Sequence, residues 1–175
     1  MKNTGRNMES SVKKPARQRI TVGDVFSVRV DEDITKYFQY VADDLTQLNS
    51  QVIRAFKRQY HANEAVIANE IVRGEIEFFA HVFLRIGLKL HYWIKLGHVP
   101  EVGTVNVFFR NSEDSGNPEV KRSEKWYVWN INQPFVDVGK LEGTYQNAEI
   151  GVVIPPDSIV HRMRTGEYDF VYPHY

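Results

Sequence analysis

The sequence predicts an α+β domain that is mostly β, with a twisted antiparallel sheet, curled into a partial barrel or two-layer sandwich, and two short helices. Three observations predict this fold class. Aromatic residues make up 13% of the chain, and most are Tyr and Phe, which favour strands. Runs that alternate apolar and polar residues recur along the chain. Turn-forming residues interrupt these runs at short intervals.

The N-terminal half predicts an antiparallel meander. In the first run Phe26, Val28 and Val30 share one face, and Ser27 and Arg29 share the other. Two more runs follow after short polar breaks, which favours consecutive pairing. The three strands are expected at 24–30, 36–42 and 51–58.

After the meander, the spacing of apolar residues changes from that of a strand to that of a helix. Apolar residues recur at helical spacing over 63–73, and Gly74 follows where a helix C-cap is typical, so a short helix is expected there. Residues 76–84 then predict an aromatic strand, and 88–96 predict its hairpin partner. Trp93 lies among apolar neighbours in that partner strand and is expected in the core.

The C-terminal half predicts shorter strands around one polar loop at 111–125. Trp126 and Trp129 are three residues apart and cannot share a strand face, so one is expected in the core and the other at a rim. A second helix is expected from Asp157 to about Arg164, before Gly166. The strands are expected at 105–109, 126–131, 135–138 and 150–154.

The chain is expected to form one domain, residues 20–175, behind a disordered basic tail, residues 1–19. Residues 1–20 hold six cations and one anion, while the rest holds sixteen cations and twenty-one anions. The tail lacks the aromatic residues that stack on bases, and the body is acidic. A nucleic-acid-binding β-barrel module is therefore kept only as an alternative function, and nucleic acid is an unfavoured partner.

Cysteine is absent, so neither disulfides nor thiolate chemistry is expected. No apolar run reaches the length of a membrane span, and no secretory signal is recognisable. The sequence therefore predicts a cytoplasmic protein without a membrane partner. No phosphate loop, metal-ligand spacing or nucleophile elbow is present, and no cofactor, metal site or catalytic residue is expected.

His81 is the one histidine that falls inside an aromatic strand. Phe79 and Phe83 lie two residues away on either side, so His81 is expected to be packed and buried for structural reasons. A small hydrolase that uses His81 and a nearby carboxylate is a second alternative. A deep polar pocket beside His81 would favour that alternative, and a packed His81 would count against it.

Carboxylates gather at the ends of the first two strands, in two groups: Asp31, Glu32 and Asp33, then Asp43 and Asp44. An acidic surface of this kind can attract a basic partner. In an antiparallel pair the two groups lie at opposite ends, so one group is the better candidate. The loop after the second strand is longer and more adaptable, which favours Asp43 and Asp44, with Tyr40 as a neighbouring aromatic contact.

Five segments resemble the immunity protein 26 family of bacterial polymorphic-toxin systems. They are VGDVFSV at 22–28, KYFQYV at 36–41, QVIRAF at 51–56, EIVRGEIEFFAH at 70–81 and WIKLG at 93–97. These motifs consist of hydrophobic and turn residues, so they identify a fold more than a chemistry.

The resemblance implies a small β-rich, non-enzymatic protein that neutralises a cognate toxin by stoichiometric binding. The resemblance implies no catalytic residue, and it does not indicate an oligomeric state. An acidic body would suit a basic nuclease as the toxin.

Overall fold

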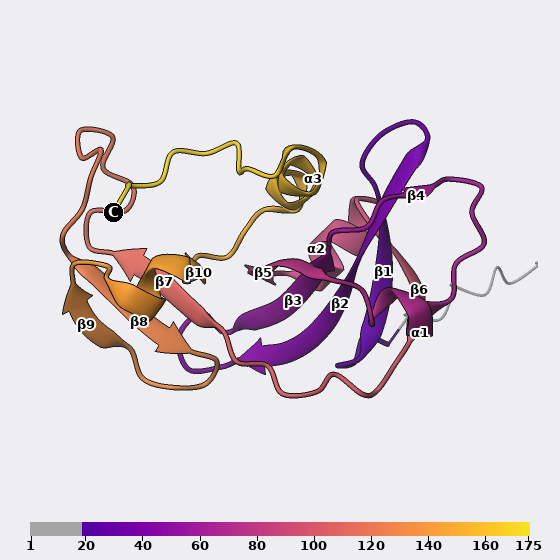
Figure 1. The fold of residues 1–175 in the computed structure, drawn as a ribbon, viewed down its shortest axis with the longest axis horizontal. Helices are drawn as coiled ribbons and strands as arrows, with labels where there is room; N and C mark the ends of the chain where they lie inside the picture. Colours follow the sequence, from indigo (N-terminus) through magenta and orange to yellow (C-terminus); the bar gives the residue numbers. More distant parts are fainter. Residues whose placement is uncertain (1–18) are drawn as a thin grey trace, which may run out of the picture.

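The computed structural model describes residues 19–175 and shows two open β-sheets side by side along the long axis, called sheet A and sheet B (Figure 1). The expected mostly β, α+β fold is confirmed, and neither sheet closes into a barrel. The expected tail lies outside the described residues, apart from Arg19. No helix in the described part of the chain is long and apolar enough to cross a membrane.

Sheet A has the strand order β5-β3-β2-β1-β6, and β4 pairs with the start of β2. All of its pairings are antiparallel, so the expected meander of the first three strands is confirmed. Its strands are β1 (Asp24–Arg29), β2 (Ile34–Asp44), β3 (Ser50–Phe56), β4 (Tyr60–His61), β5 (Ile76–Val82) and β6 (Ile94–His98).

Sheet B has the order β10-β7-β8-β9, with β10 parallel to β7. Three α-helices and one 3-10 helix accompany the sheets, where two helices were expected. The strands are β7 (Phe108–Ser112), β8 (Trp126–Asn130), β9 (Val136–Gly139) and β10 (Glu149–Ile150), and the helices are α1 (Ala68–Ile71), α2 (Leu84–Lys89), η1 (Gly143–Asn147) and α3 (Pro156–Thr165).

The segment before β6 corrects the sequence interpretation. Residues 84–89 form α2, which takes up the end of the strand expected over 76–84 and the start of the one expected over 88–96. The later strand, β6, pairs with β1 rather than with β5. Trp93 is nevertheless in the core, as predicted, and its indole Nε1 donates to the Leu84 carbonyl over 3.0 Å. Its ring lies against Gly87, where an added Cβ would approach within 1.9 Å of the ring. The packing of α2 against Trp93 therefore depends on that glycine.

Residues 149–154 connect the two sheets. Ile150 pairs with Arg110 of β7, and Val153 forms a parallel bridge with His81 of β5. The Ile154 amide then donates to the His81 carbonyl over 2.8 Å. A strand was expected over 150–154, but the segment divides its pairing between sheet B and the outer edge of sheet A.

The two tryptophans of β8 were expected on different faces of the strand, one in the core and one at a rim. Trp126 and Trp129 lie in different apolar clusters, as their spacing predicts, but both are buried. The prediction that one lies at a rim is wrong because both faces of sheet B are covered. Gly151 lies against Trp129, where an added Cβ would come within 2.1 Å of the ring.

The helices differ from expectation mainly in length. The helix expected over 63–73 is reduced to α1, a single turn before Gly74. The helix expected from Asp157 is present as α3, which ends at Gly166 in a left-handed conformation with φ of 90°. From there the C-terminal segment runs back above the sheets toward sheet B (Figure 1). His174 pairs there with residues 121–123.

Candidate functional site

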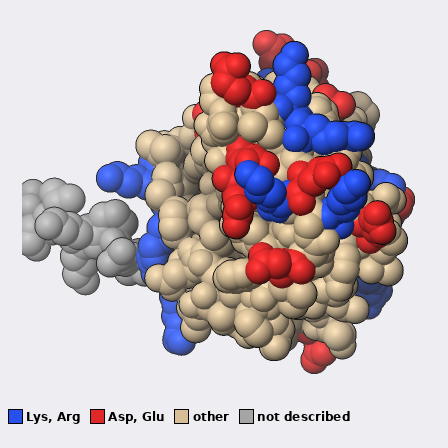
Figure 2. All heavy atoms as spheres, turned by 90° about the vertical axis from the view of Figure 1, so that its left-hand side faces the viewer, with Lys and Arg blue, Asp and Glu red and all other residues tan. Residues whose placement is uncertain are grey.

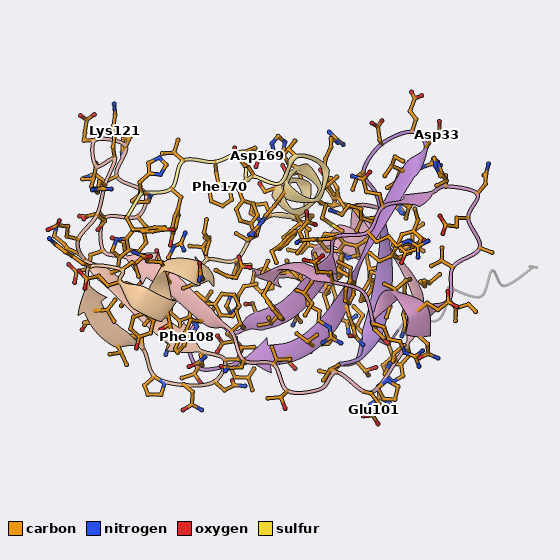
Figure 3. The ribbon with its side chains drawn as sticks, viewed as in Figure 1. Asp33, Glu101, Phe108, Lys121, Asp169 and Phe170 are labelled. Atoms are coloured by element: carbon orange, nitrogen blue, oxygen red, sulfur yellow. The ribbon has the colours of Figure 1, made fainter. Side chains whose placement is uncertain are left out.

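The acidic group Asp31, Glu32 and Asp33 forms the tip of the β1–β2 hairpin. All three residues are exposed, and the Asp31 side chain accepts a hydrogen bond from the Glu32 amide over 2.7 Å. Figure 3 shows Asp33 at the outer end of the hairpin, away from both sheets. These carboxylates are therefore available to a partner, and we call them the acidic tip.

Tyr40 does not lie on the surface. The Tyr40 side chain is buried. It contributes only to the lining of a hollow that Ile20 and Phe83 also line, among others. Burial raises the pKa of Tyr40, and a hydrogen bond and the charge of Asp43 raise it further. Its placement as an exposed aromatic contact is wrong. Asp43 is half-buried, and its carbonyl accepts a hydrogen bond from the Asn132 side chain over 2.7 Å.

Asp44 is also misplaced by the sequence interpretation. Because β2 continues to Asp44 instead of ending at residue 42, this carboxylate enters the junction of the two sheets and is 0% exposed. Asp44 Oδ2 accepts from His81 Nε2 and from Trp129 Nε1, each over 3.0 Å. Asp44 Oδ1 accepts from the Asn132 amide over 3.2 Å. Asp44 is therefore an internal acceptor and cannot be a surface contact.

His81 is fully buried, as predicted, and packs with its ring centroid 4.1 Å from that of Phe109. A carboxylate only accepts, so the proton of the neutral imidazole lies on Nε2, which faces Asp44. Nδ1 is then a buried acceptor without a donor among the described residues. Burial lowers the pKa of His81 and outweighs the opposite effect of Asp44. Hydrogen bonds from His81 and Trp129 lower the pKa of Asp44, although burial alone would raise it.

Asp44 and His81 meet across an intervening strand. In sheet A, β3 separates β2 from β5, and the register places Ser50 opposite Asp44 and Val52 opposite His81. Side chains two residues apart on a strand share a face, so Ser50 lies on the face where the pair meets. Its small side chain leaves room for that contact.

A buried Ser, His and Asp on one sheet face resemble the parts of a hydrolase, but the arrangement does not favour catalysis. Ser50 Oγ and His81 Nδ1 both lack hydrogen-bond partners within residues 19–175, so they do not bond to each other. Neither Ser50 nor His81 lines the hollows found around the described chain. Ser50 is 1% exposed and His81 is 0% exposed, so His81 is packed, and none of these hollows is the polar pocket that the hydrolase alternative predicts beside it.

Sequence reasoning missed Trp129 and Asn132, which complete the Asp44 cluster from sheet B. Asn132 has a φ of 60°, and its side chain accepts a hydrogen bond from the Leu45 amide over 2.8 Å. The break at Asn132-Gln133-Pro134 was a visible turn signal, and Asn tolerates this left-handed conformation. Its contact with Asp44 depends on how two sheets meet, which local pattern does not encode.

Large apolar side chains are exposed along α2 and β6. Ile86 and Leu90 are four residues apart on one helical face, and Ile94 and Leu96 share one face of β6. We call this set, with Phe83, the α2–β6 surface. It extends around the edge strand β6, because α2 packs on the face of sheet A that holds Phe26, whereas Ile94, paired with Ser27, lies on the opposite face. Its exposed fractions run from 41% for Phe83 to 68% for Ile94.

Charge at the opposite end of the molecule is mixed. Figure 2 views the end that carries sheet B, and Lys and Arg side chains alternate with Asp and Glu across its upper half. Two of the ion pairs there join Lys125 to Asp114 over 3.1 Å and Lys140 to Glu124 over 3.2 Å. This face therefore presents no large surface of a single sign that would attract a strongly charged partner.

Comparison with known proteins places the chain in no known group: no family model, no curated protein and no solved structure matches it. The resemblance to immunity protein 26 remains a prediction based on the five segments.

Proposed function

We propose that the chain is an immunity-type inhibitor that binds a toxin domain through the α2–β6 surface and the acidic tip. The exposure of five large apolar side chains between residues 83 and 96 carries this proposal. Exposed apolar surface bordered by charge is typical of protein-binding sites. The resemblance to immunity protein 26 supplies the class of partner.

The two parts of the proposed surface lie at the same end of sheet A. Ile94 pairs with Ser27, and β1 ends at Arg29, with only Val30 between it and the acidic tip. A hollow of about 530 Å³ lies beside them and is lined by Arg29, Thr35 and Ile94, among others. A partner that covers Ile94 can therefore approach the tip carboxylates as well.

The charge and the apolar side chains would have different roles in such a complex. Exposed carboxylates at the edge of an interface speed association with a basic partner and lose this effect as salt rises. Buried apolar contacts mainly slow dissociation. The partner that fits is thus a toxin domain with an apolar patch and basic residues beside it.

The test takes a toxin domain from a polymorphic-toxin gene in the same locus as its probe, and it measures binding kinetics on the immobilised toxin domain. We expect the double variant Ile86→Ser and Leu90→Ser to raise Kd at least about tenfold through faster dissociation. We expect Asp31→Asn with Asp33→Asn to slow association and to flatten its salt dependence. Leu45→Ser is the matched control, because Leu45 is also 68% exposed but lies outside this surface.

Equal Kd values for the Ile86/Leu90 variant and the Leu45 control would remove the α2–β6 surface from the interface. Protection of cells from the toxin without a measurable complex would contradict inhibition by binding.

A further inference from the structure

A second hollow, of about 460 Å³, lies beneath the C-terminal segment that returns from α3 to sheet B. Figure 3 shows Asp169 and Phe170 on this segment as it crosses above the sheets. Charged and aromatic side chains from sheet B, α3 and the segment itself converge on the hollow. The main ones are Arg110, Glu149, Arg162, Tyr168, Phe170 and Tyr172.

The positive charge of Arg162 is compensated by neighbouring side chains. Its Nη2 donates to Glu149 Oε2 over 3.1 Å, and Glu149 Oε1 accepts from the Phe79 amide over 3.0 Å. The guanidinium also lies 4.1 Å from the ring centroid of Phe78 and 4.6 Å from that of Tyr168. Two aromatic faces and one carboxylate hold this cation in place.

Arg110 also lies near two aromatic rings, one of them Trp126 at 5.8 Å from its guanidinium, but it has no carboxylate partner within the part of the chain that the structure describes. Its Nη1 donates only to the carbonyls of Gln146 and Ala148, and its guanidinium lies 4.8 Å from the ring centroid of Tyr175. No carboxylate side chain within residues 19–175 forms an ion pair with Arg110. Burial lowers the pKa of Arg110, since the charge is partly removed from water without a counter-ion.

Two buried polar atoms beside the hollow lack partners. Across the described chain four buried side-chain polar atoms have none, and two of them are Arg110 Nε and the Tyr168 hydroxyl. The Tyr168 hydroxyl has Arg162 beside it, whose guanidinium can donate to it. Buried donors normally find acceptors, so Arg110 Nε is the donor that an acceptor group in the hollow would satisfy. Glu167 and His174 also line the hollow but are exposed.

Aromatic side chains form another part of the lining. Phe170 stacks on Tyr168 with ring centroids 4.9 Å apart, and the Tyr172 hydroxyl donates to the Arg110 carbonyl over 2.8 Å. Burial raises the pKa of Tyr168 to about 12, so its hydroxyl stays a neutral donor. The hollow thus combines a cation that lacks a counter-ion with an aromatic wall.

We propose that this hollow binds a small organic oxyanion, a carboxylate or phosphate carried on an aromatic body. The oxyanion accepts hydrogen bonds from Arg110, whose planar guanidinium suits carboxylate and phosphate geometry. The aromatic body packs against Phe170 and its neighbours. This site is independent of the proposed toxin interface, because none of its residues belongs to the α2–β6 surface or the acidic tip.

Titration calorimetry with the full chain tests the site. The probes are phenyl phosphate, benzoate, inorganic phosphate and the neutral benzamide. We expect phenyl phosphate or benzoate to bind, inorganic phosphate to bind more weakly, and benzamide not to bind. The stronger of the first two probes identifies the headgroup. Equal binding of benzamide and benzoate would overturn the proposal, since charge would then have no role.

Variants locate the site. Arg110→Met should weaken binding about tenfold or more, which is the usual effect of a lost charge-assisted hydrogen bond. Arg73→Met is the matched control, because Arg73 is an exposed cation near α1. Phe170→Ala removes the aromatic wall from the half-exposed segment and provides a second test if Arg110→Met fails to fold. Unchanged affinity in Phe170→Ala, or an equal loss in Arg73→Met and Arg110→Met, would contradict a site in this hollow.

Discussion

The junction at Asp44 and the hollow at Arg110 both gather charged side chains where the two sheets meet, yet they differ in what surrounds the charge. At Asp44 a single carboxylate receives donors on both oxygens and is 0% exposed. At Arg110 a cation meets only neutral acceptors and opens onto a hollow. The Asp44 junction is closed to solvent and stabilises the fold, whereas Arg110 can still bind an acceptor in the hollow.

The comparison can be tested most directly by replacing each carboxylate with its amide. Asp44→Asn should be the most damaging change, because donors face both oxygens and either orientation of the amide puts an NH₂ group against them. We expect a loss of about 3–5 kcal/mol in the free energy of unfolding, typical of a broken buried network. Urea unfolding measures it. Asp31→Asn, on the exposed acidic tip, should change stability by less than about 0.5 kcal/mol.

A loss at Asp44→Asn no larger than at Asp31→Asn would show that the junction is open to water.

As the pH is lowered, the Asp44 junction should lose stability at a pH where the Arg110 hollow is still unaffected. The pKa of His81 lies below its ordinary value of 6.5, so the folded state prefers the neutral ring. The stability that this neutral ring supplies is present above about pH 6.5 and falls as the pH drops through that value toward the lower folded-state pKa. The lowered pKa of Asp44 acts in the same direction at still lower pH, below 3.8. The arginines of the hollow stay charged throughout.

Urea midpoints from about pH 8 to about pH 5 measure this effect. The decline should be shallower in His81→Gln than in wild type, while His61→Gln, which changes an exposed histidine of β4, should follow wild type. An NMR titration in which His81 itself protonates near 6.5 would instead show a solvated ring.

Glu149→Gln is expected to destabilise the fold much less than Asp44→Asn. One amide oxygen can still accept from the Phe79 amide, and Arg162 can turn toward water in the hollow. We expect a loss of about 1 kcal/mol, within the range of a partly exposed ion pair. Calorimetric unfolding of both variants, Glu149→Gln and Asp44→Asn, in the same buffer compares their losses in the free energy of unfolding. Equal losses would show that the hollow is as closed as the junction.

The difference between these two regions also explains what could be predicted from sequence. Alternation located β1, and richness in Tyr and Phe located β2, because the period and the strand propensity of a segment are local properties. The apolar run before Trp93 could be a strand or a buried helix, and only tertiary packing against Gly87 selects α2.

The functional residues show the same limit. Asp43-Asp44 followed by a polar stretch is typical of a turn, yet Asp44 is the last residue of β2. Its burial depends on His81, which lies beyond the intervening strand β3, and on Trp129 of the other sheet. Three exposed carboxylates at the acidic tip could be predicted, since that tip depends only on its own hairpin.

The connection made by residues 149–154 has a consequence for assembly during translation. The outer edge of β5 bonds to Val153 and Ile154, which the ribosome makes about seventy residues after β5 itself. Until then, the backbone amides of that edge are free to pair with another nascent chain. A pause in synthesis between β5 and residue 154 should therefore increase aggregation more than a pause after α3.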